Sequence, residues 1–102
     1  MHDPHAHLRD AVLDQVLTGP GESDSALRKA AAANSALPAD LQSLVAKVHA
    51  HAYKVTDSDV AQLQRTHSED ELFEIIVSAA LGASQKRLLA GLDALAKTEA
   101  KA

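Results

Sequence analysis

The chain of 102 residues contains no cysteine, and this absence removes several kinds of chemistry at once. Without thiols there are no disulfides, no thiolate metal sites and no thiol-based redox cycle. Tryptophan is also absent, and the aromatic side chains are one phenylalanine and one tyrosine. Because hydrophobic residues still make up 46% of the sequence, the core is predicted to consist of Ala, Leu, Val and Ile, which favours close-packed helices.

Basic residues are too few and too scattered to form a binding stripe for a polyanion. Lys and Arg number 10 against 14 Asp and Glu, which gives a net charge of −4 with neutral histidines. We therefore expect neither nucleic acid nor a membrane as a partner. The longest apolar stretch, residues 75–83, is too short to span a bilayer. The N-terminus MHDPHAHLRD lacks the apolar core of a signal peptide, so the sequence predicts a cytoplasmic protein.

Apolar residues recur at helical spacing, and no segment alternates in the way of a half-buried strand. We therefore predict one all-α domain over residues 1–102, a compact bundle of about five helices with a long C-terminal helix. Residues 1–4 and 98–102 are expected to be disordered. Pro, Gly and capping residues place the predicted helices at about residues 4–17, 24–34, 38–52, 57–65 and 69–97.

The predicted C-terminal helix has an unusual distribution of apolar residues. It is apolar almost all round between residues 72 and 83, and a bend or break is expected, if anywhere, at Gly82 or Gly91. One helix over residues 69–97 would span roughly 40 Å, longer than a domain of this size is wide. Because an exposed apolar surface of that extent marks an association site, we expect a homo-oligomer. The residues assigned to the partner are Leu88, Leu92 and Leu95.

The stretch VHAHAYKVTDSDV, residues 48–60, places two histidines and a tyrosine between two predicted helices. At about 100° per residue, His49 and His51 flank the apolar stripe on opposite sides, so this i, i+2 pair does not face one metal ion. His49 and Tyr53 stand at i, i+4, where they can stack or hydrogen-bond but do not form a usual metal pair. We interpret the histidines as residues of a helix C-terminus and expect no metal or cofactor.

Polar residues at capping positions predict the starts of two helices. Thr56 with Asp59, and Ser68 with Glu71, have the spacing of a capping box. The acidic residues 69–71 then fall in a first helical turn, where the helix dipole favours them. We prefer this stabilising role to that of paired catalytic carboxylates.

The segment TGPGES, residues 18–23, is predicted to be a turn because two glycines around a proline do not continue a helix. It lacks the preceding strand and the closing lysine of a phosphate loop. Ser23 or Asp24 is expected to cap the helix that follows. Asp24 and Arg28 stand at i, i+4, where they can pair on the helix surface.

The block AYKVTDSDVAQLQRTHSEDELFEIIVSAALGASQKRL, residues 52–88, resembles the second half of the carboxymuconolactone decarboxylase and alkylhydroperoxidase D-like proteins. The resemblance lies in V-T-D-x-D-V, S-x-x-[DEQ]-[IL]-[FL]-E, a run of small residues, and R-L near the end. It implies an all-α, homo-oligomeric protein, and many members are peroxidases that use Glu, Cys-x-x-Cys and His. The cysteines have no counterpart here, and residues 28–47 stand in their region. Arg87 matches the family's arginine, whereas Lys86 replaces a frequent Asn.

Two functions follow as hypotheses. The favoured one is a cysteine-less, alkylhydroperoxidase D-like protein that acts as an oligomeric assembly or accessory module without thiol peroxidase activity. The alternative is a thiol-independent lyase or isomerase, as the decarboxylase resemblance implies. Its proton transfer would use one or more of His49, Tyr53, His67 and Glu74, since histidine titrates near neutral pH.

A third hypothesis is metal capture at the N-terminus by His2, His5 and His7, because histidine-rich tracts bind metals. It requires a short terminal segment to become ordered around the ion. We give it less weight than a solvated terminus.

Overall fold

The computed structural model describes the backbone of residues 6–101 and the side chains of residues 6–98. Helices make up most of it, and no strand occurs in this part of the chain, so the all-α class and the five predicted helices are confirmed. Of the residues expected to be disordered, 1–4 and 102 lie outside the described range, and the backbone of residues 98–101 is helical. The elements are α1 (Ala6–Thr18), α2 (Ser25–Ala33), α3 (Ala39–His51), the 3-10 helix η1 (Ala52–Lys54), α4 (Asp57–Leu63) and α5 (Glu69–Lys101).

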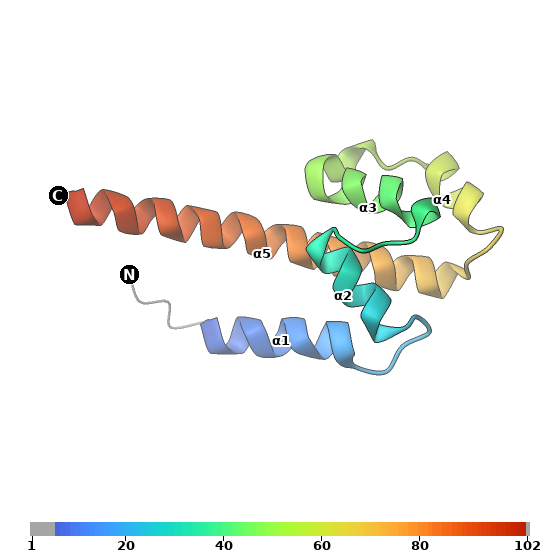
Figure 1. Ribbon diagram of the computed structural model, residues 1–102, viewed down its shortest axis with the longest axis horizontal. Coiled ribbons are helices and arrows are strands. Elements are labelled where there is room, and N and C mark those ends of the chain that lie inside the picture. Colours follow the sequence, from blue (N-terminus) through green and yellow to red (C-terminus); the bar gives the residue numbers. More distant parts are fainter. Residues whose placement is uncertain (1–5, 102) are drawn as a thin grey trace.

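Helix α5 is the spine of the molecule. It runs for 33 residues without interruption at Gly82 or Gly91, and it ends at Lys101 where the sequence predicts an end near Lys97. Helices α2, α3 and α4 lie along its N-terminal half, α1 runs beside its middle, and its C-terminal end extends beyond them (Figure 1). The radius of gyration is therefore 15.6 Å, against about 13 Å for a compact domain of 100 residues.

The core lies where α2 and α3 cross the N-terminal half of α5. The apolar residues predicted to form one face over residues 38–52 are Leu41, Leu44, Val45, Val48 and Ala52. The first four are buried there, whereas Ala52 falls in η1 and is exposed. Both aromatic residues lie outside this core, with Phe73 67% and Tyr53 81% exposed, so the core is aliphatic as predicted. Its main residues are Ala31, Leu41, Leu44, Val45, Val48, Leu72, Ile75 and Ala79.

Gly82 lets α2 and α5 approach closely. A Cβ atom at this position would overlap the backbone carbonyl of Ala32 in α2. Alanines occupy the neighbouring contact positions, Ala31 on α2 and Ala79 on α5. The glycine therefore serves helix packing and leaves α5 unbroken.

The capping residues act where the sequence predicts them. Asp24 accepts a hydrogen bond from the Ala26 N–H, and Thr56 and Asp59 form both bonds of a capping box. Ser68 and Glu71 make the same reciprocal pair of bonds at the start of α5. The acidic residues 69–71 thus lie in the first turn of α5.

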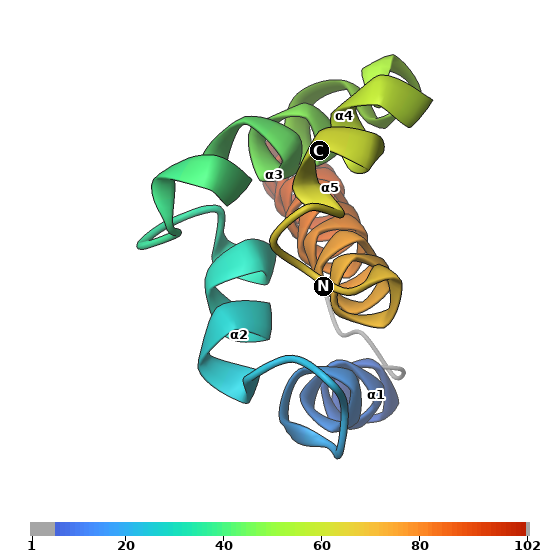
Figure 2. The ribbon, with the colours of Figure 1, turned by 90° about the vertical axis from the view of Figure 1, so that its right-hand side faces the viewer.

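The arrangement around α5 leaves one side of that helix open. Viewed nearly along α5, Figure 2 shows α2, α3 and α4 on the left and above, with α1 below. In the described part of the chain no helix covers the right-hand side in this view. Among these residues, no helix combines the length and apolar character needed to cross a membrane.

Candidate functional site

The side chains considered for proton transfer are held at separate places by structural contacts. His49, in the last turn of α3, donates from Nε2 to the Ala31 carbonyl of α2 at 2.8 Å. His67 precedes α5, and its Nε2 lies 2.7 Å from Oδ2 of Asp40. The His49 ring therefore links α3 to α2, and the His67 ring links the segment before α5 to α3.

Tyr53 and Glu74 also lie in different parts of the molecule. Tyr53 lies in η1, where its ring makes an edge contact with His51, two residues earlier, at 5.7 Å between centroids. Among three pockets of the described residues, one contains Glu74, and none contains His49, Tyr53 or His67. The structure does not bring the four residues together.

The part of the chain that the structure describes contains no cluster of metal-binding side chains. Within residues 6–98, no three His, Asp or Glu side chains are placed where they could hold a metal ion. His7 is exposed on α1, and His2 and His5 lie outside the described residues.

The basic pair near the middle of α5 binds backbone carbonyls of other helices. Lys86 Nζ donates to the Ala33 carbonyl at 3.2 Å, at the end of α2. Arg87 Nη2 donates to the His49 carbonyl at 2.6 Å, in the last turn of α3. Cations are favourable at these positions, because the C-terminal ends of both helices carry partial negative charge. Arg87, the residue that resembles the family's arginine, thus has a structural contact here.

Glu74 anchors the turn between α1 and α2 to α5. Its Oε2 accepts from the Glu22 N–H at 2.8 Å, and its Oε1 accepts from the Ser23 N–H at 3.0 Å and the Ser23 hydroxyl at 2.6 Å. The hydroxyl of Ser23 contributes most to lowering the pKa of Glu74, followed by the two backbone N–H groups. Gly21 allows this approach, because a Cβ there would lie 2.5 Å from Glu74 Oε1.

Arg28 is the second anchor of this turn, and its role differs from the one that its sequence position suggests. It is only 5% exposed, and no ion pair with Asp24 forms. Its Nη1 donates to the Val16 carbonyl and its Nη2 to the Gly19 carbonyl, both at 2.7 Å, at the end of α1. The sequence indicates this role only through the spacing of Arg28 and Ala31, which are three residues apart and therefore share one face of α2.

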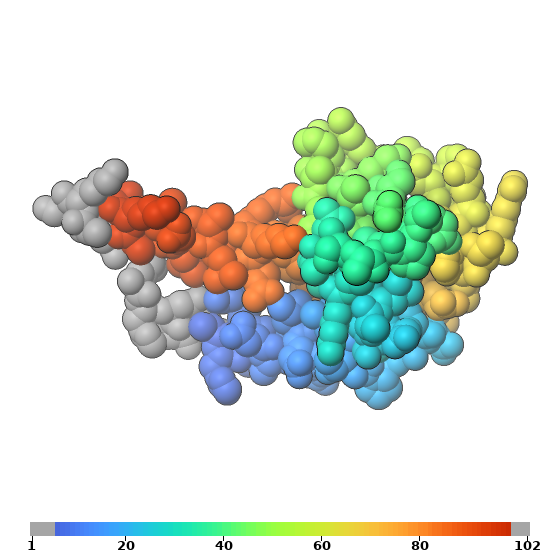
Figure 3. All heavy atoms as spheres, in the orientation of Figure 1, coloured from blue at the N-terminus to red at the C-terminus, as the bar shows by residue number. Residues whose placement is uncertain are grey.

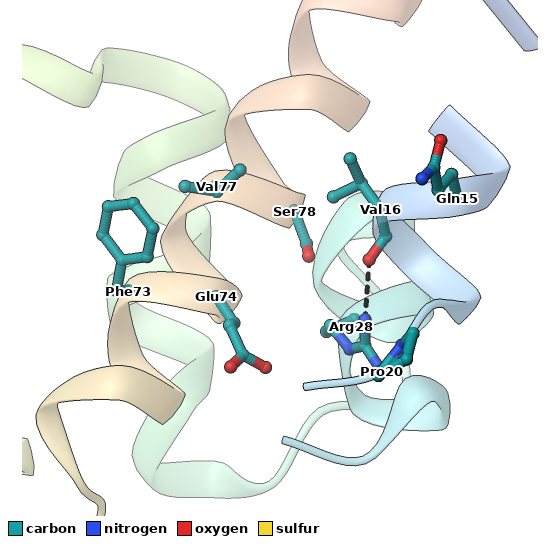
Figure 4. A pocket seen from close by; sticks show the side chains of 8 residues that line it. All are labelled: Gln15, Val16, Pro20, Arg28, Phe73, Glu74, Val77 and Ser78. Atoms are coloured by element: carbon teal, nitrogen blue, oxygen red, sulfur yellow. Dashed lines mark hydrogen bonds between the residues drawn. The ribbon is translucent and has the colours of Figure 1, made fainter. Parts of the chain in front are cut away.

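Between these anchors lies a pocket of about 230 Å³, here called the turn pocket. Val16 and Pro20 from the α1 side and Phe73 and Val77 from α5 supply apolar walls; Gln15, Arg28, Glu74 and Ser78 complete the lining. Figure 4 shows the Ser78 hydroxyl directed towards the space between Glu74 and Arg28.

Two buried polar atoms of the turn pocket have no hydrogen-bond partner among the described residues. Ser78 is fully buried, and its Oγ has no hydrogen-bond partner within the described residues; the same holds for Nε of Arg28. Such groups are rare in folded proteins because each costs the free energy of its lost hydration. The pocket therefore has two donors with unused hydrogen-bonding capacity.

A second feature is an apolar stripe on the open side of α5. At about 100° per residue, it lies about 180° around the helix from the core residues Leu72, Ile75 and Ala79. None of its members is buried. This open stripe consists of Phe73, Val77, Leu81, Leu88, Leu92 and Leu95.

Helix α1, beside α5, is also incompletely covered. It has no buried residue, and Leu8 and Val12 are 65% and 50% exposed. A groove of about 370 Å³ separates it from α2 and α5, with Leu13, Leu17 and Leu89 among its lining residues. Figure 3 shows α1 in blue and the C-terminal half of α5 in orange to red, extending away from the packed helices.

The chain was compared with protein-family models, with curated protein sequences and with solved structures. None of the three comparisons found a match.

Proposed function

We propose that this chain is a helical assembly or accessory module whose copies associate through the open stripe of α5. The observation that carries the proposal is that α5 is apolar on two opposite faces, of which α2 and α3 cover one. The stripe includes the three leucines assigned to a partner from the sequence, and it extends to Phe73 and Val77 near the other end of the helix. An apolar face of this length is typical of an association site.

The occupant proposed for the stripe is a second copy of the chain. An identical helix offers an identical row of apolar side chains, and a two-fold axis brings two such rows into mutual contact. Each half-exposed leucine gains about 1 kcal/mol when its remaining surface is buried. Leu88 and Leu95 are 40% and 43% exposed, so they have surface left to bury.

The resemblance of residues 52–88 to the alkylhydroperoxidase D-like proteins supports the same proposal, because it implies helical homo-oligomers. The chain would be a cysteine-less protein of that kind, without thiol peroxidase activity. Proton transfer by His49, Tyr53, His67 and Glu74 has no comparable support, because each side chain has its own place in the fold.

The test is the mass in solution of the unmodified protein and of two matched variants. Leu92→Glu places a carboxylate in the stripe, and a charge buried in an apolar contact costs several kcal/mol. We expect the dissociation constant to rise at least about tenfold, which corresponds to about 1.4 kcal/mol. Ala90→Glu adds the same charge at an exposed position on another face of α5, and it should leave the mass unchanged.

Light scattering at micromolar concentration distinguishes the outcomes. An oligomeric mass that falls in Leu92→Glu alone supports the proposal. A monomeric mass for the unmodified protein, or equal effects of the two glutamates, would show that the stripe does not bind a second copy.

A further inference from the structure

We propose that the turn pocket binds a small uncharged carboxamide, held by Ser78, Arg28 and Glu74. The pocket is formed where the end of α1 and the following turn meet α5 (Figure 4). Phe73 and Val77 belong to both this pocket and the open stripe, but the polar atoms that carry this proposal lie inside one chain.

The hydrogen-bonding capacity of the pocket defines one half of the ligand. Arg28 uses Nη1 and Nη2 on the carbonyls of Val16 and Gly19, which leaves its Nε–H without an acceptor. The Ser78 hydroxyl also has no partner in the part of the chain that the structure describes. A carbonyl oxygen has two lone pairs, so one ligand carbonyl has the capacity to accept from both donors.

Glu74 defines the other half. Its Oε2 accepts a single hydrogen bond, from the Glu22 N–H, and a carboxylate oxygen has room for a second donor. An amide N–H group supplies that donor next to the carbonyl. The planar carboxamide therefore matches the pocket: its carbonyl accepts from Ser78 and Arg28, and its N–H donates to Glu74.

The charges in the pocket favour a neutral ligand. Arg28 is a cation and Glu74 is an anion, and both line the same cavity. A carboxylate ligand gains from Arg28 but is repelled by Glu74, and an ammonium ligand meets the opposite combination. Neither charged head satisfies both partners.

The size and the walls of the pocket favour a compact apolar body. The volume of about 230 Å³ exceeds the roughly 150 Å³ of a cavity that accommodates benzene. Val16, Pro20 and Val77 line it, and the exposed Phe73 ring provides a flat surface beside it. Benzamide is a suitable probe, because it joins one six-membered ring to one carboxamide.

The experiment follows backbone amide signals of the full chain by NMR during titration with benzamide, benzoate and benzylamine. We expect saturable shifts for benzamide at residues 15–23 and 73–78, with a Kd of about 1 mM or below for a ligand of this size. Benzoate and benzylamine, which keep the ring and change the head, should bind at least about fivefold more weakly. Equal affinity for the three probes, or no saturable shift with benzamide, would overturn the proposal.

Two variants and one control test whether benzamide binds in the turn pocket. Ser78→Ala should weaken benzamide about fivefold, as expected for one hydrogen bond, whereas the exposed Ser84→Ala should leave its Kd unchanged. Val77→Phe should abolish binding by filling the pocket. If Ser78→Ala or Val77→Phe retains the unmodified Kd, the ligand is not bound here.

The stability of Ser78→Ala gives a second, independent readout. Because the hydroxyl has no partner among residues 6–98, its removal should leave the melting temperature unchanged or raise it. A clear fall in melting temperature would mean that a water molecule already hydrogen-bonds to the Ser78 hydroxyl. The hydroxyl would then not be a free donor for a ligand, and the proposal would be wrong.

Discussion

Replacing Glu74 by Ala removes the side chain that ties the α1–α2 turn to α5. Three hydrogen bonds end on this carboxylate, from Glu22 and Ser23, which lie 52 and 51 residues earlier in the chain. Hydrogen bonds to charged groups contribute about 1.5–3 kcal/mol each, but bonds that share one acceptor are not additive. Since the bond from Glu22 is exposed, we expect a loss of about 2–3 kcal/mol of unfolding free energy. For a domain near 100 residues this lowers the melting temperature by roughly 10–20 °C.

The effect of Glu74→Ala should depend on pH with a definite sign. The hydrogen bonds from Ser23 and Glu22 lower the pKa of Glu74 in the folded protein. A carboxyl group with a lowered folded pKa contributes stability above its unfolded pKa of about 4.3. That contribution is lost as the pH falls through the folded pKa. The difference between the unmodified protein and the variant should therefore be largest at neutral pH and should narrow in acid.

Thermal unfolding followed by circular dichroism at pH 7 and near pH 3 tests both statements, at equal protein concentration because assembly raises melting temperatures. Glu22→Ala is the matched control, since it removes an exposed carboxylate from the same turn and keeps the N–H that Glu74 binds. It should change stability by no more than about 0.5 kcal/mol. Equal losses in the two variants, or a difference that stays constant on acidification, would refute the anchoring role of Glu74.

Three further predictions follow from particular residues. Gly82→Ala should lower the unfolding free energy, because overpacking against the Ala32 carbonyl costs about 1–3 kcal/mol, which exceeds the gain in helix propensity. Gly91→Ala should raise the unfolding free energy by about 0.5–1 kcal/mol, because no atom of the described residues lies within 4 Å of the added Cβ. Denaturant unfolding of both variants compares the two positions. His49→Ala and His51→Ala should leave zinc affinity unchanged in calorimetry, and a tight site lost in either variant would contradict this. Purified metal-free protein should not turn over an organic hydroperoxide with a dithiol reductant, because the chain has no cysteine; turnover would disprove it.

Local features of the fold could be predicted because their causes lie within a few residues in the chain. The capping boxes at Thr56 and Ser68 need a partner three residues away, and the structure contains both. The apolar repeat of α3 likewise indicates its buried face. The largely aliphatic character of the core follows from composition, since two aromatic residues cannot fill it.

The turn pocket and the role of Gly82 could not be predicted in this way. Arg28 bonds to carbonyls of the preceding helix, and Glu74 bonds to a turn some fifty residues earlier. A glycine that breaks a helix and one that admits a neighbouring helix look the same in the sequence. The spatial neighbours of these residues are determined by how α1, α2 and α5 pack.

The sequence by itself determined that the chain is helical, lacks thiol chemistry and has a last helix with more apolar surface than its own domain covers. Helical repeat, composition and length are sufficient for these conclusions. Only the tertiary structure decided which side of α5 is buried, because packing against α2 and α3 selects one of two apolar faces. It also decided that Ser78 and Arg28 share a pocket with unused hydrogen-bond donors, since the satisfaction of a buried polar group depends on every element packed around it.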